Sequence, residues 1–167
     1  MLCLLLAMPV HATDTWTEIA PGIDLLTRTA AGPRNIYVAQ VDLSRDEISL
    51  RATMSGEAGR TTGSFSNLVD ATVAINGDWF TSGSSPVGMS IGHGWQWGND
   101  DTDVHSFIAC NVTNECWIDP AAHQASFTPR HWTVVGGFDA RLVTDGVAHA
   151  PTGSVYRTDL LPRSAVG

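Results

Sequence analysis

The chain has 167 residues and a formal net charge of −8, with nine arginines and no lysine. Apolar residues make up 43% and charged residues 16%, which is typical of a globular domain and excludes a disordered chain. The length fits one domain, and an acidic chain without a basic cluster argues against nucleic acid as a partner.

Residues 1–12, MLCLLLAMPVHA, resemble the end of a secretory signal peptide. The apolar run from Leu2 to Met8 has the length of a signal core, and Val10 to Ala12 matches a small-x-small cleavage pattern. A basic segment before the run is missing, and the run is too short for a stable membrane span. The alternative is a buried N-terminal strand or helix. We expect a mature domain over residues 13–167, secreted or periplasmic.

Two β-strands are expected early in the mature chain. Residues 35–43, NIYVAQVDL, alternate between apolar and polar side chains and are rich in branched and aromatic ones. Residues 47–54, EISLRATM, follow after a short turn and would pair with them as a hairpin.

One short amphipathic helix is predicted next. Phe65, Leu68 and Val69 stand at i, i+3 and i+4, which places them on one helical face. Thr62 or Ser64 would cap its N-terminus.

The rest of the chain reads as short strands separated by turns. Residues 72–76, TVAIN, predict a buried strand, and residues 86–97 predict a hairpin that bends at Gly92-His93-Gly94. Further strands are expected at residues 105–110, 115–119, 131–137 and 141–146. The predicted fold class is α+β, a β-rich mixed sheet with few short helices.

Cys110 and Cys116 are expected to form a disulfide. They bracket Asn111–Asn114, a turn-rich tetrapeptide, and export would place them in an oxidising compartment. Cys3 would leave with the signal peptide, and no second cysteine pair accompanies this one, which argues against zinc. Asn111-Val112-Thr113 also matches the N-glycosylation sequon, which matters only in a eukaryotic source.

Four segments in order resemble the phosphodiester glycosidase family. They are AINGDWF (residues 74–80), SPVGMSIGHG (85–94), VVGGFDARLVTDG (134–146) and LPRSAVG (161–167). Members of that family continue past the last segment into an Asp-Gly-Arg turn and a glycine-rich stretch. The resemblance therefore covers the N-terminal part of the domain, and we expect an incomplete domain.

The resemblance implies an exported hydrolase that cleaves the glycosidic bond of a sugar-1-phosphodiester without a cofactor. Its partner would be a phosphate-linked sugar or polysaccharide. Whether this chain alone has enzyme activity stays open, and a secreted carbohydrate-binding or surface module without turnover is the alternative. The sequence does not indicate an oligomeric state.

Arg163 and Asp78 are the expected catalytic residues. A guanidinium can bind two phosphate oxygens at once, and Arg163 precedes small residues that allow close approach. Asp78 follows the Asn76-Gly77 turn and would act as a base, a nucleophile or a metal ligand. The alternatives are a surface ion pair for Arg163 and a local turn carboxylate for Asp78.

The remaining expected site residues surround that turn and the arginine. Asn76 and Gly77 shape the turn, and the resemblance adds Gly88 and Ser164 as substrate-binding positions. Trp79 would offer a ring face to a sugar, or else pack in a hairpin. His93 would reach a bound substrate, or else face solvent at the bend.

No metal ligand set is predicted. Asn99, Asp101 and Asp103 stand at alternate positions, as in the first half of a calcium loop. The glycine and the distal glutamate of that loop are missing, so these residues are interpreted as a solvated acidic turn.

Overall fold

A computed structural model describes residues 13–30, 34–77, 79–98, 106–119, 131–138, 141–149 and 163–167. The expected signal segment and the acidic stretch at residues 99–103 lie outside the described residues. The chain divides into two compact units, Met1–Ile48 and Ser49–Gly167. Each unit is described by itself.

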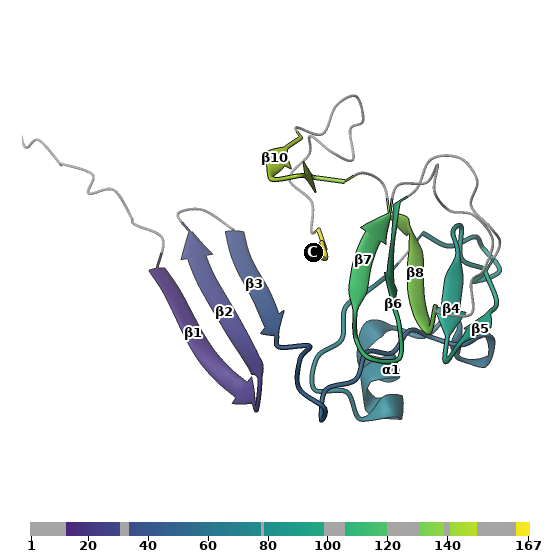
Figure 1. Ribbon diagram of the computed structural model, residues 1–167, viewed down its shortest axis with the longest axis horizontal. Helices are drawn as coiled ribbons and strands as arrows, with labels where there is room; N and C mark the ends of the chain where they lie inside the picture. The colour runs from purple at the N-terminus through teal and green to yellow at the C-terminus, as the bar shows by residue number, and fades with distance from the viewer. Residues whose placement is uncertain are drawn as a thin grey trace, which may run out of the picture. The chain divides into compact units, whose positions relative to one another are not determined.

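The first unit is a three-stranded antiparallel meander of β1 (Thr13–Ala20), β2 (Ile23–Ala30) and β3 (Arg34–Val41) (Figure 1). The register places Trp16 opposite Leu26, and Leu26 opposite Val38. Leu26 is buried, because as the central member of this row it has a neighbour on both sides.

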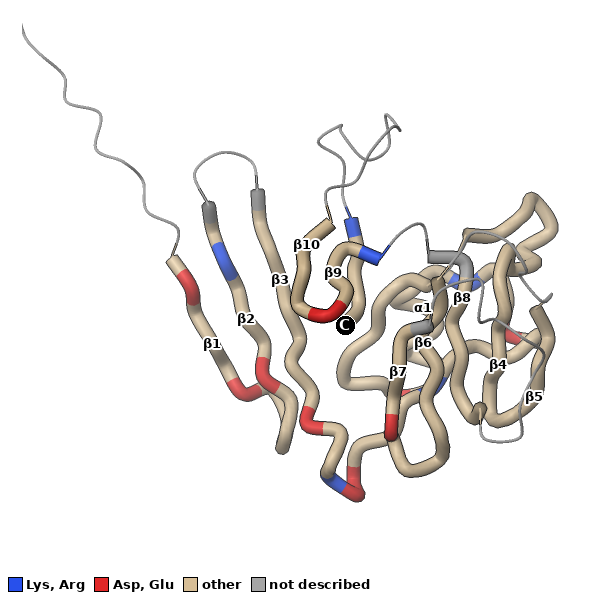
Figure 2. Tube along the Cα trace, turned by 45° about the horizontal axis from the view of Figure 1, so that its top comes forward, with Lys and Arg blue, Asp and Glu red and all other residues tan. Residues whose placement is uncertain are grey.

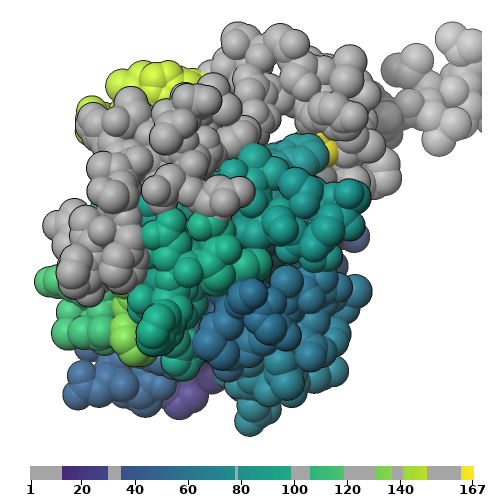
Figure 3. Space-filling view, turned by 90° about the vertical axis from the view of Figure 1, so that its right-hand side faces the viewer, coloured from purple at the N-terminus to yellow at the C-terminus, as the bar shows by residue number. Residues whose placement is uncertain are grey.

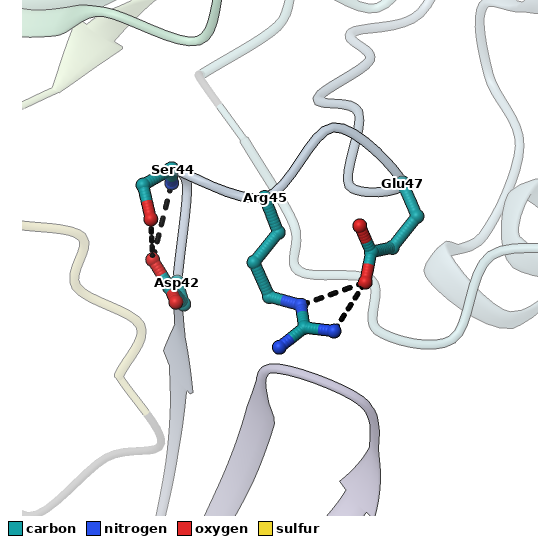
Figure 4. Close-up of polar contacts among 4 residues, drawn as sticks. All are labelled: Asp42, Ser44, Arg45 and Glu47. Carbon is teal, nitrogen blue, oxygen red and sulfur yellow. Dashed lines mark hydrogen bonds and ion pairs between the residues drawn. The ribbon is translucent and has the colours of Figure 1, made fainter.

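The loop that follows β3 closes over the turn between β1 and β2 (Figure 4). The Asp42 N–H donates to the Gly22 carbonyl at 2.9 Å. A Cβ at Gly22 would lie 2.3 Å from Cδ of Arg45, so the arginine side chain crosses the turn where only glycine fits. Arg45 Nε donates to Glu47 Oε1 at 2.8 Å, and Ser44 Oγ donates to Asp42 Oδ1 at 2.6 Å.

Acidic groups of the first unit are held in the ionised form by these contacts. Hydrogen bonds from Ser44 lower the pKa of the Asp42 carboxyl. Asp14 and Arg28 are cross-strand partners with two contacts of 2.6 Å, and the hydrogen bond from Arg28 lowers the pKa of Asp14. Figure 2 shows both signs of charge along this sheet and its loop.

The second unit holds a five-stranded antiparallel sheet. The spatial order is β5 (Trp95–Gln96), β4 (Ser90–Gly92), β8 (Thr133–Phe138), β6 (Ser106–Cys110) and β7 (Cys116–Asp119) (Figure 1). Its core is a cluster of fully buried apolar side chains, with Trp117 packed against it: Met89, Ile91, Phe107, Ala109 and Val134. Paired strands contribute these side chains to one face, as the period of two requires.

The described residues of this unit also form three smaller elements. They are the 3-10 turn η1 (Ser55–Glu57), the helix α1 (Thr62–Val69) and the hairpin of β9 (Val143–Thr144) with β10 (Val147–Ala148). The predicted helix is confirmed, but its cap is Thr61, whose hydroxyl accepts from the Ser64 N–H at 3.2 Å. The capping residue thus stands one position before Thr62 and three before Ser64, the two that were expected.

The prediction of a strand over residues 47–54 is wrong. The segment is assigned to no strand; instead its carbonyls accept hydrogen bonds from one side chain in the sheet and one directly after it. Thr133 Oγ1 donates to the Leu50 carbonyl at 3.2 Å, and Trp97 Nε1 donates to the Thr53 carbonyl at 2.7 Å. The partner of β3 is β2, a strand that was not among those expected.

The buried strand predicted at residues 72–76 is also wrong. The segment forms no strand, and Val73 and Ile75 are exposed. The predicted fold class, β-rich α+β with few helices, is nevertheless confirmed by three antiparallel sheets and one short α-helix among the described residues.

Candidate functional site

Asn76 and Ser164 lie side by side although 88 residues separate them. Ser164 Oγ donates to Asn76 Oδ1 at 2.5 Å, and both residues are exposed. In Figure 3 the yellow end of the chain emerges against the teal surface of the second unit. The contact joins two of the four motifs, AINGDWF and LPRSAVG.

Gly77 packs directly on the central strand of the five-stranded sheet. A Cβ at this position would lie 2.8 Å from Cγ1 of Val135 in β8. The chain therefore approaches the sheet through Gly77. Val135 was not among the predicted site residues, and only its place before Gly136-Gly137 signalled a close backbone approach.

Gly88 lies beside the next residue of β8. A Cβ at Gly136 would lie 2.7 Å from the Met89 carbonyl oxygen and 3.3 Å from the Gly88 carbonyl carbon. The ladder between β6 and β8 shifts register here: Ser106 pairs with Phe138, whereas Ile108 pairs with Val135. This bulge holds Gly136 and Gly137, and it lets the Gly88–Met89 backbone cross the strand.

Trp79 and Phe80 begin a tight loop next to the site. The Val87 N–H donates to the Trp79 carbonyl at 2.8 Å, and Phe80 forms an isolated antiparallel bridge with Pro86. The aromatic side chains are 55% and 71% exposed. A ring held by its backbone while its face meets solvent can stack on a sugar.

Arg163 immediately precedes Ser164 and is exposed. The bond between the Ser164 and Asn76 side chains therefore brings the chain at Arg163, the residue before Ser164, near Asn76. The Ser164 hydroxyl occupies Asn76 Oδ1, so Nδ2 of that amide remains to donate. Asp78, the second predicted catalytic residue, lies outside the described residues.

His93 is not brought to this group. His93 and Gly94 have φ of +50° and +75° and form the two-residue turn between β4 and β5. The Gly94 N–H donates to the Trp132 carbonyl, whereas Gly77 contacts Val135. The His93 ring lies 5.6 Å from the Trp132 ring, just before β8 begins, and three residues along a strand correspond to roughly 10 Å, so His93 is away from Gly77.

The predicted disulfide between Cys110 and Cys116 is present, with a Cα–Cα distance of 4.1 Å. Asn111 organises the loop inside it. Its Oδ1 accepts from the Thr113 N–H at 2.9 Å and the Glu115 N–H at 3.0 Å, and its Nδ2 donates to Glu115 Oε2 at 2.6 Å. The hairpin is consistent with an oxidising compartment.

Other site types find no support in the part of the chain that the structure describes. No group of three or more His, Cys, Asp or Glu side chains is placed to hold a metal ion there. Among the same residues, no helix has the length and apolar character to cross a membrane. A shallow hollow lined by Glu18 to Pro21 contains none of the predicted site residues.

No family model matches the chain, and neither a curated protein nor a solved structure is significantly similar to it.

Proposed function

We propose that the chain acts on phosphate-linked sugars as an exported hydrolase of sugar-1-phosphodiesters. The observation that carries the proposal is the Ser164–Asn76 hydrogen bond, which puts the backbone next to Arg163 beside the Asn76-Gly77 turn. The disulfide supports a secreted or periplasmic location.

The chemistry assigned to each group follows from its type. The Arg163 guanidinium would bind two phosphate oxygens, and the Asn76 Nδ2 would donate to a third oxygen or to the sugar. Phosphate is a good leaving group, so the reaction chiefly needs charge stabilisation and a base or nucleophile at the anomeric carbon. Asp78 would supply the latter, and Trp79 would hold the sugar ring.

A second candidate is a secreted carbohydrate-binding module without turnover. The exposed rings of Trp79 and Phe80 favour it, because sugar faces stack on such surfaces. Binding would then rest on the aromatic residues, and no sugar would be released.

Binding and turnover are measured separately to distinguish the two candidates. Titration calorimetry with a sugar-1-phosphate reports binding, and a free-sugar assay on a sugar-1-phosphodiester reports turnover. Arg163→Ala is expected to weaken phosphate binding roughly tenfold or more, because charge-assisted hydrogen bonds are lost. Asp78→Asn should abolish sugar release while binding persists.

Arg60→Ala is the matched control, since Arg60 is an exposed arginine of the same unit outside the site. It should bind as the parent chain does. Equal binding by the parent and Arg163→Ala would contradict the phosphate role of Arg163. Binding without release, abolished by Trp79→Ala but not by Arg163→Ala, would support the module instead.

A further inference from the structure

Asn76 is the one asparagine of the sequence that a glycine follows. The other five precede bulkier residues: Asn35, Asn67, Asn99, Asn111 and Asn114. A glycine leaves its own backbone nitrogen sterically open to the preceding side chain, because it has no Cβ. The contact between Gly77 and Val135 excludes a larger residue, so the fold requires this glycine.

The environment of the pair leaves the reacting atoms accessible. Asn76 and Gly77 are both exposed, and no hydrogen bond of the Gly77 N–H is found among the described residues. The backbone N–H of Gly77 takes part in no helix or strand pairing, since residues 71–77 form no helix or strand. Solvent base therefore reaches the N–H, and water reaches the side-chain carbonyl.

We propose that Asn76 is a site of spontaneous deamidation and that the Ser164 hydroxyl slows it. The Gly77 nitrogen loses its proton to solvent base and attacks Cγ of Asn76. The Cγ–Nδ2 bond breaks, the nitrogen leaves as ammonia, and a cyclic imide joins the two residues. Water opens the imide at either carbonyl and leaves aspartate or isoaspartate at position 76.

Ser164 acts as a restraint on this reaction. Attack requires Cγ to swing toward the Gly77 nitrogen, and the 2.5 Å bond from Ser164 Oγ holds Oδ1 in its present place. Breaking the bond is part of reaching the reactive geometry. Ser164→Ala is therefore expected to speed deamidation roughly fivefold, the factor that one net hydrogen bond contributes.

The test is a time course of the folded chain at neutral and mildly alkaline pH, followed by peptide mapping with mass detection of aspartate and isoaspartate. Asn67 is the internal control, because it is exposed but lies in α1 and precedes Leu68. Conversion at position 76 should exceed conversion at position 67 and rise with pH, as an attacking amide anion requires. Equal slow conversion at both positions would overturn the proposal.

Two variants separate the restraint from general loosening of the fold. Ser164→Thr keeps the hydroxyl and should convert at the parent rate, whereas Ser164→Ala should convert faster. Equal rates in the two variants would overturn the role of Ser164. The readout is covalent modification, so it is independent of whether the chain hydrolyses a phosphodiester.

Discussion

Gly77 is required by a contact and not by its backbone torsion. Its φ angle is not in the positive range that favours glycine. Four other glycines do have positive φ angles: Gly22, Gly59, Gly94 and Gly146. The close neighbour is Cγ1 of Val135, which sits on a central strand and has little freedom to move. A side chain at position 77 would therefore displace the turn from the sheet.

We predict that Gly77→Ala destabilises the chain by about 1–3 kcal/mol, the usual cost of overpacking. Denaturant unfolding followed by tryptophan fluorescence measures it. Gly63→Ala is the control, since no atom lies within 4 Å of its added Cβ and its helical position favours alanine. Val135→Ala should relieve the clash, so the double variant should lose less than the two single losses together. If the stability loss of the double variant equals the sum of the two single losses, the contact between Gly77 and Val135 does not carry the effect.

At the scale of elements, the hairpin of β6 and β7 has two independent supports. The disulfide closes the loop covalently, and the Asn111 side chain makes four hydrogen bonds within it. Both supports act on the loop that joins the ladder partners Cys110 and Cys116.

Replacing both cysteines by serine should lower the free energy of unfolding by about 2 kcal/mol on the loop-entropy model. The hairpin should nevertheless persist, because the Asn111 bonds remain. Near-ultraviolet circular dichroism reports whether the hairpin persists, and denaturant unfolding reports the loss of stability. Adding Asn111→Ala to the double serine variant should then abolish the protection of the β6–β7 backbone amides from hydrogen exchange. Loss of the hairpin in the double serine variant alone would contradict the second support.

Elements bounded by strong turn residues were predictable from the sequence. The β4–β5 hairpin follows from Gly92-His93-Gly94, and the strands around the disulfide follow from Cys110 and Cys116. The meander of β1 and β2 was missed although Pro21-Gly22 marks its turn. The error at residues 72–76 has another cause: a short apolar run without alternation does not reveal whether any strand lies beside it.

Motifs in the sequence single out the residues of the candidate site, but they do not reveal the contact between two of them. Asn76 and Ser164 meet across 88 residues, and no local pattern records such a contact. Only the order of the four motifs suggested that the two segments belong together. The placement of His93 away from Gly77 follows from the register of β4 on β8, which no single-sequence pattern encodes.

At the scale of the whole molecule, the two compact units differ in what holds them. The first relies on strand pairing and on surface ion pairs such as Asp14–Arg28, with Leu26 as its buried residue among those described. The second has a fully buried apolar cluster and a disulfide, besides the less exposed ion pair of Arg51 with Glu57. Acid should therefore act on them differently.

We predict that acid loosens the first unit before the second. The pKa of Asp14 is lowered in the fold, so its contribution is present above its ordinary value of about 3.9 and is lost as pH falls below it. Hydrogen exchange with mass detection, read separately for peptides of residues 13–48 and 49–167, should show protection lost first in the former. Asp14→Asn should remove part of this acid response, since Asp42 and Glu47 have lowered pKa values as well. Loss of hydrogen-exchange protection at the same pH in both sets of peptides would contradict the prediction.

The hydrogen bond that the Asn111 side-chain amide donates to Glu115 has a consequence for producing the protein. In a eukaryotic secretory host the sequon would be open to a glycan while the nascent chain is still extended. Sugar attached there replaces one hydrogen of the Nδ2 group that bonds Glu115 in the finished hairpin. Material from such a host and material from a bacterial periplasm would thus differ at the tip of this loop, in a way that a Thr113→Ala substitution would equalise.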